Sequence, residues 1–96
     1  MIVGVLQVEL FVDGSQSLKD KRRLVQSVKD RLHREHQVSV AEVGSLDDHR
    51  VAVLGITMAS NSVSYCQGAL GGVLEKIRRH RGCALGDHHT EILTGQ

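Results

Sequence analysis

The sequence predicts an α+β fold in which a four-stranded antiparallel sheet carries two helices on one face. Two observations lead to this prediction. Segments with alternating or β-branched apolar residues indicate strands, and they lie at residues 2–12, 38–43, 51–59 and within 85–93. Two longer segments with apolar residues at helical spacing lie between them, at 18–36 and 63–81, so that the order is βαββαβ.

The first strand is predicted from a period of two that starts at Ile2, with even positions forming an apolar face and odd positions a mixed one. Residues 13–15 (Asp-Gly-Ser) then indicate a turn, because Gly permits positive φ and the Asp and Ser side chains bond to nearby backbone groups. Ser17, with Asp20 three positions later, is typical of a capped helix N-terminus.

The first helix is predicted over Leu18 to about His36, with one apolar stripe that faces the sheet. Lys21 falls inside this stripe, so its ammonium group must reach solvent past the helix end or pair with a carboxylate. We expect such a pairing rather than a ligand contact. The stripe consists of Leu18, Leu24, Val25, Val28 and Leu32.

The second half of the chain repeats the alternation of strand and helix. A polar loop, residues 44–49, joins two short strands and predicts a hairpin. Asn61 or Ser62 can cap the second helix, and Gly82 is its predicted C-terminal cap after a cationic last turn. The final strand completes a ferredoxin-like sandwich, and we expect all 96 residues to form a single domain.

The composition is that of a globular protein, with 41% hydrophobic and 24% charged residues. A net charge of +1 excludes a uniformly basic nucleic-acid module and an acidic tail. The two cysteines are too few for a disulfide framework, which favours a reducing compartment. Because the sequence shows neither a signal peptide nor a membrane span, we expect a cytoplasmic protein that does not bind membranes.

A further indication comes from four segments, Met1–Leu6, Ser17–Arg22, Val38–Val43 and Ser60–Asn61. Together they resemble the DUF503 (YlxP-like) family of small bacterial proteins, and Ser-Leu-Lys-x-Lys-Arg at 17–22 is the most specific of them. The resemblance implies a ferredoxin-like fold and no established activity. Genes of this family commonly lie among those for translation initiation and ribosome maturation, which implies an RNA-linked role.

Charge is distributed unevenly along the chain. Residues 17–36 hold seven cations against three acids, and residues 75–81 hold four against one. Any amphipathic helix needs a charged solvent face, but this excess predicts that the helix layer attracts phosphates of RNA or of a ribosomal particle. The candidate phosphate-binding residues are Lys19, Lys21, Arg22, Arg23, Lys29, Arg34, Lys76, Arg78, Arg79 and Arg81.

The sheet face opposite the helices is the second candidate surface. An apolar face of this kind on a small protein tends to be covered by a partner. The alternative function is therefore homodimerisation in which the sheet faces of two copies pack together. Pairing of edge strands is the competing mode of dimerisation. RNA-recognition motifs stack bases on central aromatic residues of this face, and the sequence places none there. The predicted dimer face consists of Val3, Val5, Val51 and Val53, with Phe11 beside them.

Metal and catalytic motifs are weak or missing. His33 and His36 are three residues apart on a helix, and His88 and His89 point to opposite faces of a strand, but spacing fixes no third ligand. No nucleophile elbow, phosphate-binding loop or dinucleotide fingerprint occurs. We therefore expect a binding module rather than an enzyme, with no cofactor, metal or small-molecule substrate.

Overall fold

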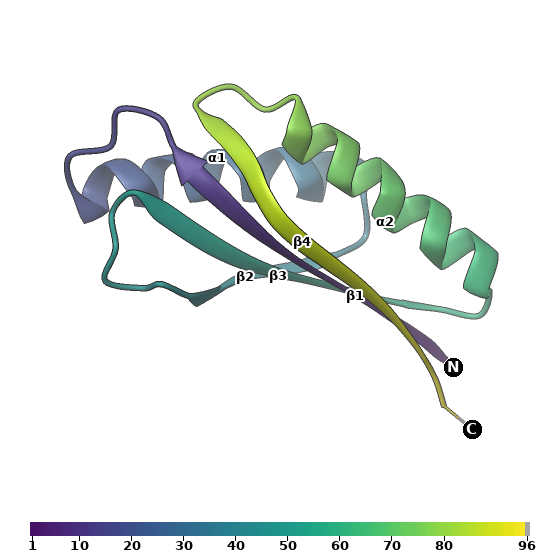
Figure 1. Ribbon diagram of the computed structural model, residues 1–96. Helices are drawn as coiled ribbons and strands as arrows, with labels where there is room; N and C mark the ends of the chain where they lie inside the picture. The colour runs from purple at the N-terminus through teal and green to yellow at the C-terminus, as the bar shows by residue number, and fades with distance from the viewer. Residues whose placement is uncertain (96) are drawn as a thin grey trace.

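A computed structural model describes residues 1–95 and confirms the predicted order βαββαβ (Figure 1). Each helix and strand lies close to the segment from which it was predicted. The elements are β1 (Ile2–Val12), α1 (Leu18–Glu35), β2 (Ser39–Gly44), β3 (Val51–Ser60), α2 (Val63–Arg78) and β4 (Cys83–Thr94).

The four strands form one sheet in the order β2-β3-β1-β4, and every neighbouring pair is antiparallel. The predicted hairpin is the β2–β3 pair, while β1 and β4 bring the two ends of the chain to one end of the sheet (Figure 1). Both helices cover the same face, as expected. The ferredoxin-like sandwich is thereby confirmed.

The core lies between this inner sheet face and the helices. The even residues of β1 and β3 supply its sheet side, and the predicted stripes of α1 and α2 supply the other. Gly4 lets α2 approach closely, since a Cβ atom there would lie 2.8 Å from the Leu70 side chain. The fully or nearly fully buried core residues include Leu6, Val8, Leu10, Leu54, Ile56, Val28, Leu32, Cys66, Leu70, Val73 and Ile77.

Side chains cap both helices at the N-terminus. The Ser17 hydroxyl accepts a hydrogen bond from the backbone N–H of Asp20 at 3.1 Å, and Ser62 accepts one from Tyr65 at 3.2 Å. The Asp20 carboxylate reaches back to the backbone N–H of Gln16 at 2.9 Å rather than to that of the capping serine. These two hydrogen bonds hold the backbone in place before and after the capping residue Ser17.

The prediction for the end of α2 was wrong by three residues, because the helix ends at Arg78 rather than at about Arg81. The backbone N–H of His80 bonds to the carbonyl of Ile77, which tightens the chain into a shorter turn. Gly82 follows with φ +90°, beyond the helix, and its carbonyl accepts a hydrogen bond from Asp13. This glycine therefore turns the chain into β4 instead of capping α2 directly.

Candidate functional site

The solvent face of α1 is strongly basic. Lys19, Arg22, Arg23 and Arg34 are exposed, and Lys29 is partly buried. No carboxylate within the described residues forms a salt bridge with any of these five side chains. The structure thus brings half of the predicted phosphate-binding residues to one helix with their charges unneutralised.

The acidic residues of the helix layer are all engaged elsewhere. Asp20 accepts from the backbone of Gln16, and Asp30 accepts from the Gln26 amide at 2.8 Å. Glu35 pairs with Lys76, whose hydrogen bond holds the pKa of this carboxyl below its usual value. Asp20 and Asp30 keep their negative charge, because their partners are neutral, but neither forms a salt bridge with an α1 cation in the described residues.

The cations of α2 differ from those of α1, because most of them are paired. Arg78 lies 3.2 Å from Glu75, and Arg79 lies 3.9 Å from the same carboxylate. Lys76 bridges to Glu35 and also lies 2.8 Å from Nε2 of His36. Among the predicted residues after α1, only Arg81 is exposed without such a partner in residues 1–95.

Lys21 does not contact solvent, so its inclusion among the phosphate-binding residues was wrong. Its side chain is 1% exposed, and Nζ lies 2.7 Å from Oε2 of Glu42 in β2. The same ammonium donates to the backbone carbonyls of Ser45 and Val51 at 2.9 and 3.1 Å. The pairing with a carboxylate that the helical stripe predicted is confirmed.

Arg31 is a further basic residue of α1 that is absent from the predicted phosphate-binding set. It lies near His80, and the pKa of this imidazole is lowered by burial and by the Arg31 charge. The Ser27 hydroxyl is 3.1 Å from Nε2 of His80, so the α2–β4 connection packs against the middle of α1. We call Lys19, Arg22, Arg23, Lys29, Arg31, Arg34 and Arg81 the basic helix surface.

The outer face of the sheet is less continuous than predicted. Val3 and Val5 lie near one end of β1, whereas Val51 and Val53 pair with the other end. Gln7 pairs with Gly55 and His89 between the two groups of valines. The four predicted dimer-face residues are each partly buried, and they form two apolar patches on either side of a polar centre.

Exposed apolar residues extend one of these patches. Phe11 lies over Gly86 of β4, where a Cβ atom would come 2.7 Å from its ring. Val43 similarly lies over Gly55 of β3. Both side chains are exposed on the face away from the helices.

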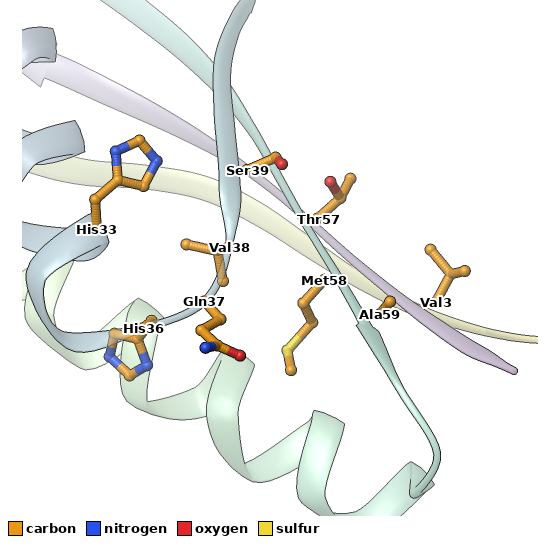
Figure 2. A pocket seen from close by; sticks show the side chains of 9 residues that line it. All are labelled: Val3, His33, His36, Gln37, Val38, Ser39, Thr57, Met58 and Ala59. Carbon is orange, nitrogen blue, oxygen red and sulfur yellow. The ribbon is translucent and has the colours of Figure 1, made fainter.

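A cleft lies at the C-terminal end of α1, beside the connection from α1 to β2. Figure 2 shows its sheet side, which is lined by His33 and His36 at the end of α1, Ser39 of β2 and Thr57, Met58 and Ala59 of β3. A second hollow of about 400 Å³ shares this wall and extends to Tyr65 and Ala69 of α2. No pattern in the sequence indicates this cleft, because three separate elements build it.

His36 lies at the centre of this wall. The Lys76 ammonium group can only donate a hydrogen bond, so Nε2 of His36 accepts and the ring is neutral with its proton on Nδ1. Burial and the Lys76 charge lower the pKa of His36. His36 is therefore a neutral imidazole rather than a second cation at this position.

The remaining histidines and acidic residues form no cluster of metal ligands. Among the described residues, no three His, Cys, Asp or Glu side chains lie close enough together to hold a metal ion. The Asp48 carboxylate in the β2–β3 loop accepts from the backbone N–H of Arg50, which lowers the pKa of Asp48. None of the helices described in residues 1–95 has the length and apolar character needed to cross a membrane.

The sheet order and the two helices on one face place this protein in the ferredoxin-like class. Within that class the chain belongs to the DUF503 family, described as "Protein of unknown function", whose model matches residues 3–90. The resemblance seen in the sequence is thus confirmed. No curated protein matches the sequence.

Two solved structures of designed proteins share the fold. The de novo designed protein LFR1 1 with ferredoxin fold is 16% identical, with a TM-score of 0.59 over 99% of this chain and 88% of that chain. The de novo designed protein Foldit4 is 15% identical, with a TM-score of 0.53 over 98% of this chain and 99% of that chain. Likeness at such identities shows the fold alone.

Proposed function

We propose that this protein is a non-catalytic, cytoplasmic module that binds RNA or a ribosomal particle through its basic helix surface. The observation that carries the proposal is the imbalance of pairing in the helix layer. Asp20, Asp30, Glu35 and Glu75 are each bonded within the protein, while seven exposed or partly buried cations have no carboxylate partner in residues 1–95. Such a surface attracts a polyanion.

Contacts to phosphate are the mode of binding that this surface supports. Arginine binds phosphate oxygens in a bidentate manner, and four of the seven cations are exposed residues of one helix. Phosphate contacts position RNA without reading its sequence. We therefore expect low sequence specificity from the basic helix surface.

The outer sheet face does not support recognition of RNA by base stacking. The central strands carry Val5, Gln7, Gly55 and Thr57 there, and an aliphatic or amide side chain gives no platform for a base. The only aromatic residue of this face, Phe11, lies at the end of β1. This supports the helix layer as the proposed RNA-binding side.

The test is RNA binding by fluorescence anisotropy at several salt concentrations. The affinity is expected to fall with a log–log slope of about −0.7 for each phosphate contacted on single strands. The variant Arg22→Gln, Arg23→Gln, Lys29→Gln removes three charges from the basic helix surface and should reduce both affinity and slope. Binding that is independent of salt would overturn the proposal.

A matched control removes the same charge elsewhere. Arg50→Glu changes the β2–β3 loop and Gln67→Glu changes an exposed position in the first half of α2, and together they lower the net charge by three. This double variant should bind RNA almost as the wild type does. An equal loss in both variants would mean that only net charge matters.

The second candidate function is homodimerisation through the outer sheet face. The exposed Phe11 and Val43 favour it, because they enlarge the patch around Val51 and Val53. Val53→Glu should convert the dimer to a monomer in analytical ultracentrifugation, and Val5→Lys tests the other patch in the same way. A wild-type protein that sediments as a monomer at high concentration excludes this function.

A further inference from the structure

The cleft beside α1 contains an aromatic side chain that the fold does not need. Tyr65 lies in the first turn of α2 and is 68% exposed. Its backbone N–H is held by Ser62, but its phenol hydroxyl makes no hydrogen bond within the part of the chain that the structure describes. An exposed ring on a fixed backbone is a suitable surface for a flat ligand.

Small residues of α2 create the space next to this ring. Tyr65, Ala69 and Gly72 follow one another at helical spacing along the face that lies toward the end of α1. A Cβ atom at Gly72 would lie 3.5 Å from Cε1 of His36, an ordinary contact distance, so the His36 ring packs against α2 at this glycine. The resulting volume of about 400 Å³ lies at the lower end of the range for small-ligand sites.

The polar groups of the cleft suit a nucleotide. Arg34 lines it, is exposed and belongs to the basic helix surface, so a phosphate held there continues the path of a bound strand. Gln37 lines the cleft and is exposed, so its amide can donate to and accept from a base edge. Glu35, the acidic residue of this wall, is already paired with Lys76.

We propose that this cleft holds one unstacked base of single-stranded RNA, with the base on the ring of Tyr65 and its phosphate on Arg34. The inference rests on the proposed function and adds to it a preference for single strands over duplexes. Unpaired bases stack on aromatic side chains, whereas a duplex keeps its bases inside and offers only phosphates.

Intrinsic fluorescence gives a direct readout, because Tyr65 is the only tyrosine and the chain has no tryptophan. Titration of the wild-type protein with a uridine decamer at low salt should quench the tyrosine emission. An RNA duplex at the same nucleotide concentration absorbs comparably and should bind without this quenching. RNA affinity is followed in parallel by anisotropy of a labelled strand.

Substitutions at Tyr65 separate stacking from charge. Tyr65→Ala should weaken binding of the single strand about tenfold and leave duplex binding unchanged. Tyr65→Phe keeps a ring and should bind the single strand as the wild type does. Because the side chain is exposed, thermal unfolding should be unchanged in both variants.

The outcomes distinguish this inference from the function on which it rests. The proposed base-binding cleft is overturned if RNA binding is salt-sensitive but does not quench Tyr65, or if Tyr65→Ala binds the single strand with full affinity. Either result leaves the basic helix surface as the RNA-binding surface. Absence of any RNA binding at low salt overturns both.

Discussion

The ammonium group of Lys21 in α1 lies 2.7 Å from the carboxylate of Glu42 in β2, and the lysine is almost fully buried. Backbone carbonyls of Ser45, Leu46 and Val51 surround the same nitrogen atom. Ser45 adopts a positive φ of 52°, which is unfavourable for a residue with a Cβ atom. Lys21 therefore ties α1 to the hairpin and holds the loop between β2 and β3 in place.

Replacement of Lys21 by Met should lower the free energy of unfolding by about 3 kcal/mol, because it leaves buried carbonyl acceptors without a donor. Glu42→Gln should cost less, about 1–2 kcal/mol, since the ammonium retains its carbonyl partners and Glu42 is 20% exposed. Urea unfolding measures both changes. Arg22→Met, at the exposed neighbouring position, is the control and should stay within about 0.5 kcal/mol.

The same variant tests the corrected role of Lys21. A buried ammonium group cannot reach a phosphate, so Lys21→Met at a temperature where it is folded should bind RNA as the wild type does. A loss of affinity as large as that of the basic helix surface variant would contradict this assignment.

Periodicity was sufficient to predict most of the fold. The even residues of β1 and β3 and the stripes of both helices are the core, and Lys21 was placed correctly among them as a paired residue. The last strand was predicted too short by two residues at its start and one at its end, and a bulge that interrupts its alternation was not predicted. Leu85 pairs with Leu10 and His88 with Val8, so the inward positions change from odd to even numbers between them.

The candidate site was harder to predict, because contacts between distant segments decide which charges are free. Net charge along α2 suggested that Lys76, Arg78 and Arg79 resemble the α1 cations, yet Glu35 and Glu75 pair with them. The cleft joins the end of α1 to the start of α2, about thirty residues later in the chain. No local pattern at Tyr65 indicates which elements will lie beside it.

Stability should decrease as the pH falls below about 6.5, the ordinary pKa of histidine. Burial lowers the pKa of His36 and of His80 in the folded protein, so the unfolded chain takes up protons first. Their contribution is present above pH 6.5 and is lost as the pH falls through the folded pKa values. Urea midpoints measured between pH 7.5 and 5, at ~0.5-unit steps, would show the decline.

His36→Gln and His80→Gln should each make this decline shallower. Glu35 provides an internal comparison, because its pKa is lowered from 4.5 by the hydrogen bond with Lys76. The contribution of Glu35 is present above pH 4.5 and disappears only below it. A decline of equal slope in the double histidine variant would show that other groups cause it.

The two cysteines should react slowly with a thiol reagent in the folded protein. Cys66 is fully buried, and burial together with the charge of Asp13 raises the pKa of the Cys83 thiol. Since the thiolate is the reactive form, a disulfide reagent at neutral pH should modify both residues only as the protein unfolds in urea. Cys83→Ser should halve the final thiol titre, and immediate reaction of Cys83 in the native protein would contradict this prediction.

Gly68 and Gly71 can be used to stabilise α2, because a Cβ atom at either position would meet open space. Each glycine in a helix costs about 1 kcal/mol relative to alanine, so Gly68→Ala and Gly71→Ala should each raise the free energy of unfolding by about 0.5–1 kcal/mol. Gly4→Ala is the matched control with the opposite sign, since its Cβ atom would collide with Cys66 and with Leu70. Chemical unfolding of the three variants measures these changes. If Gly68→Ala or Gly71→Ala destabilises the protein, another surface approaches this side of α2 in solution, and a partner must be sought there.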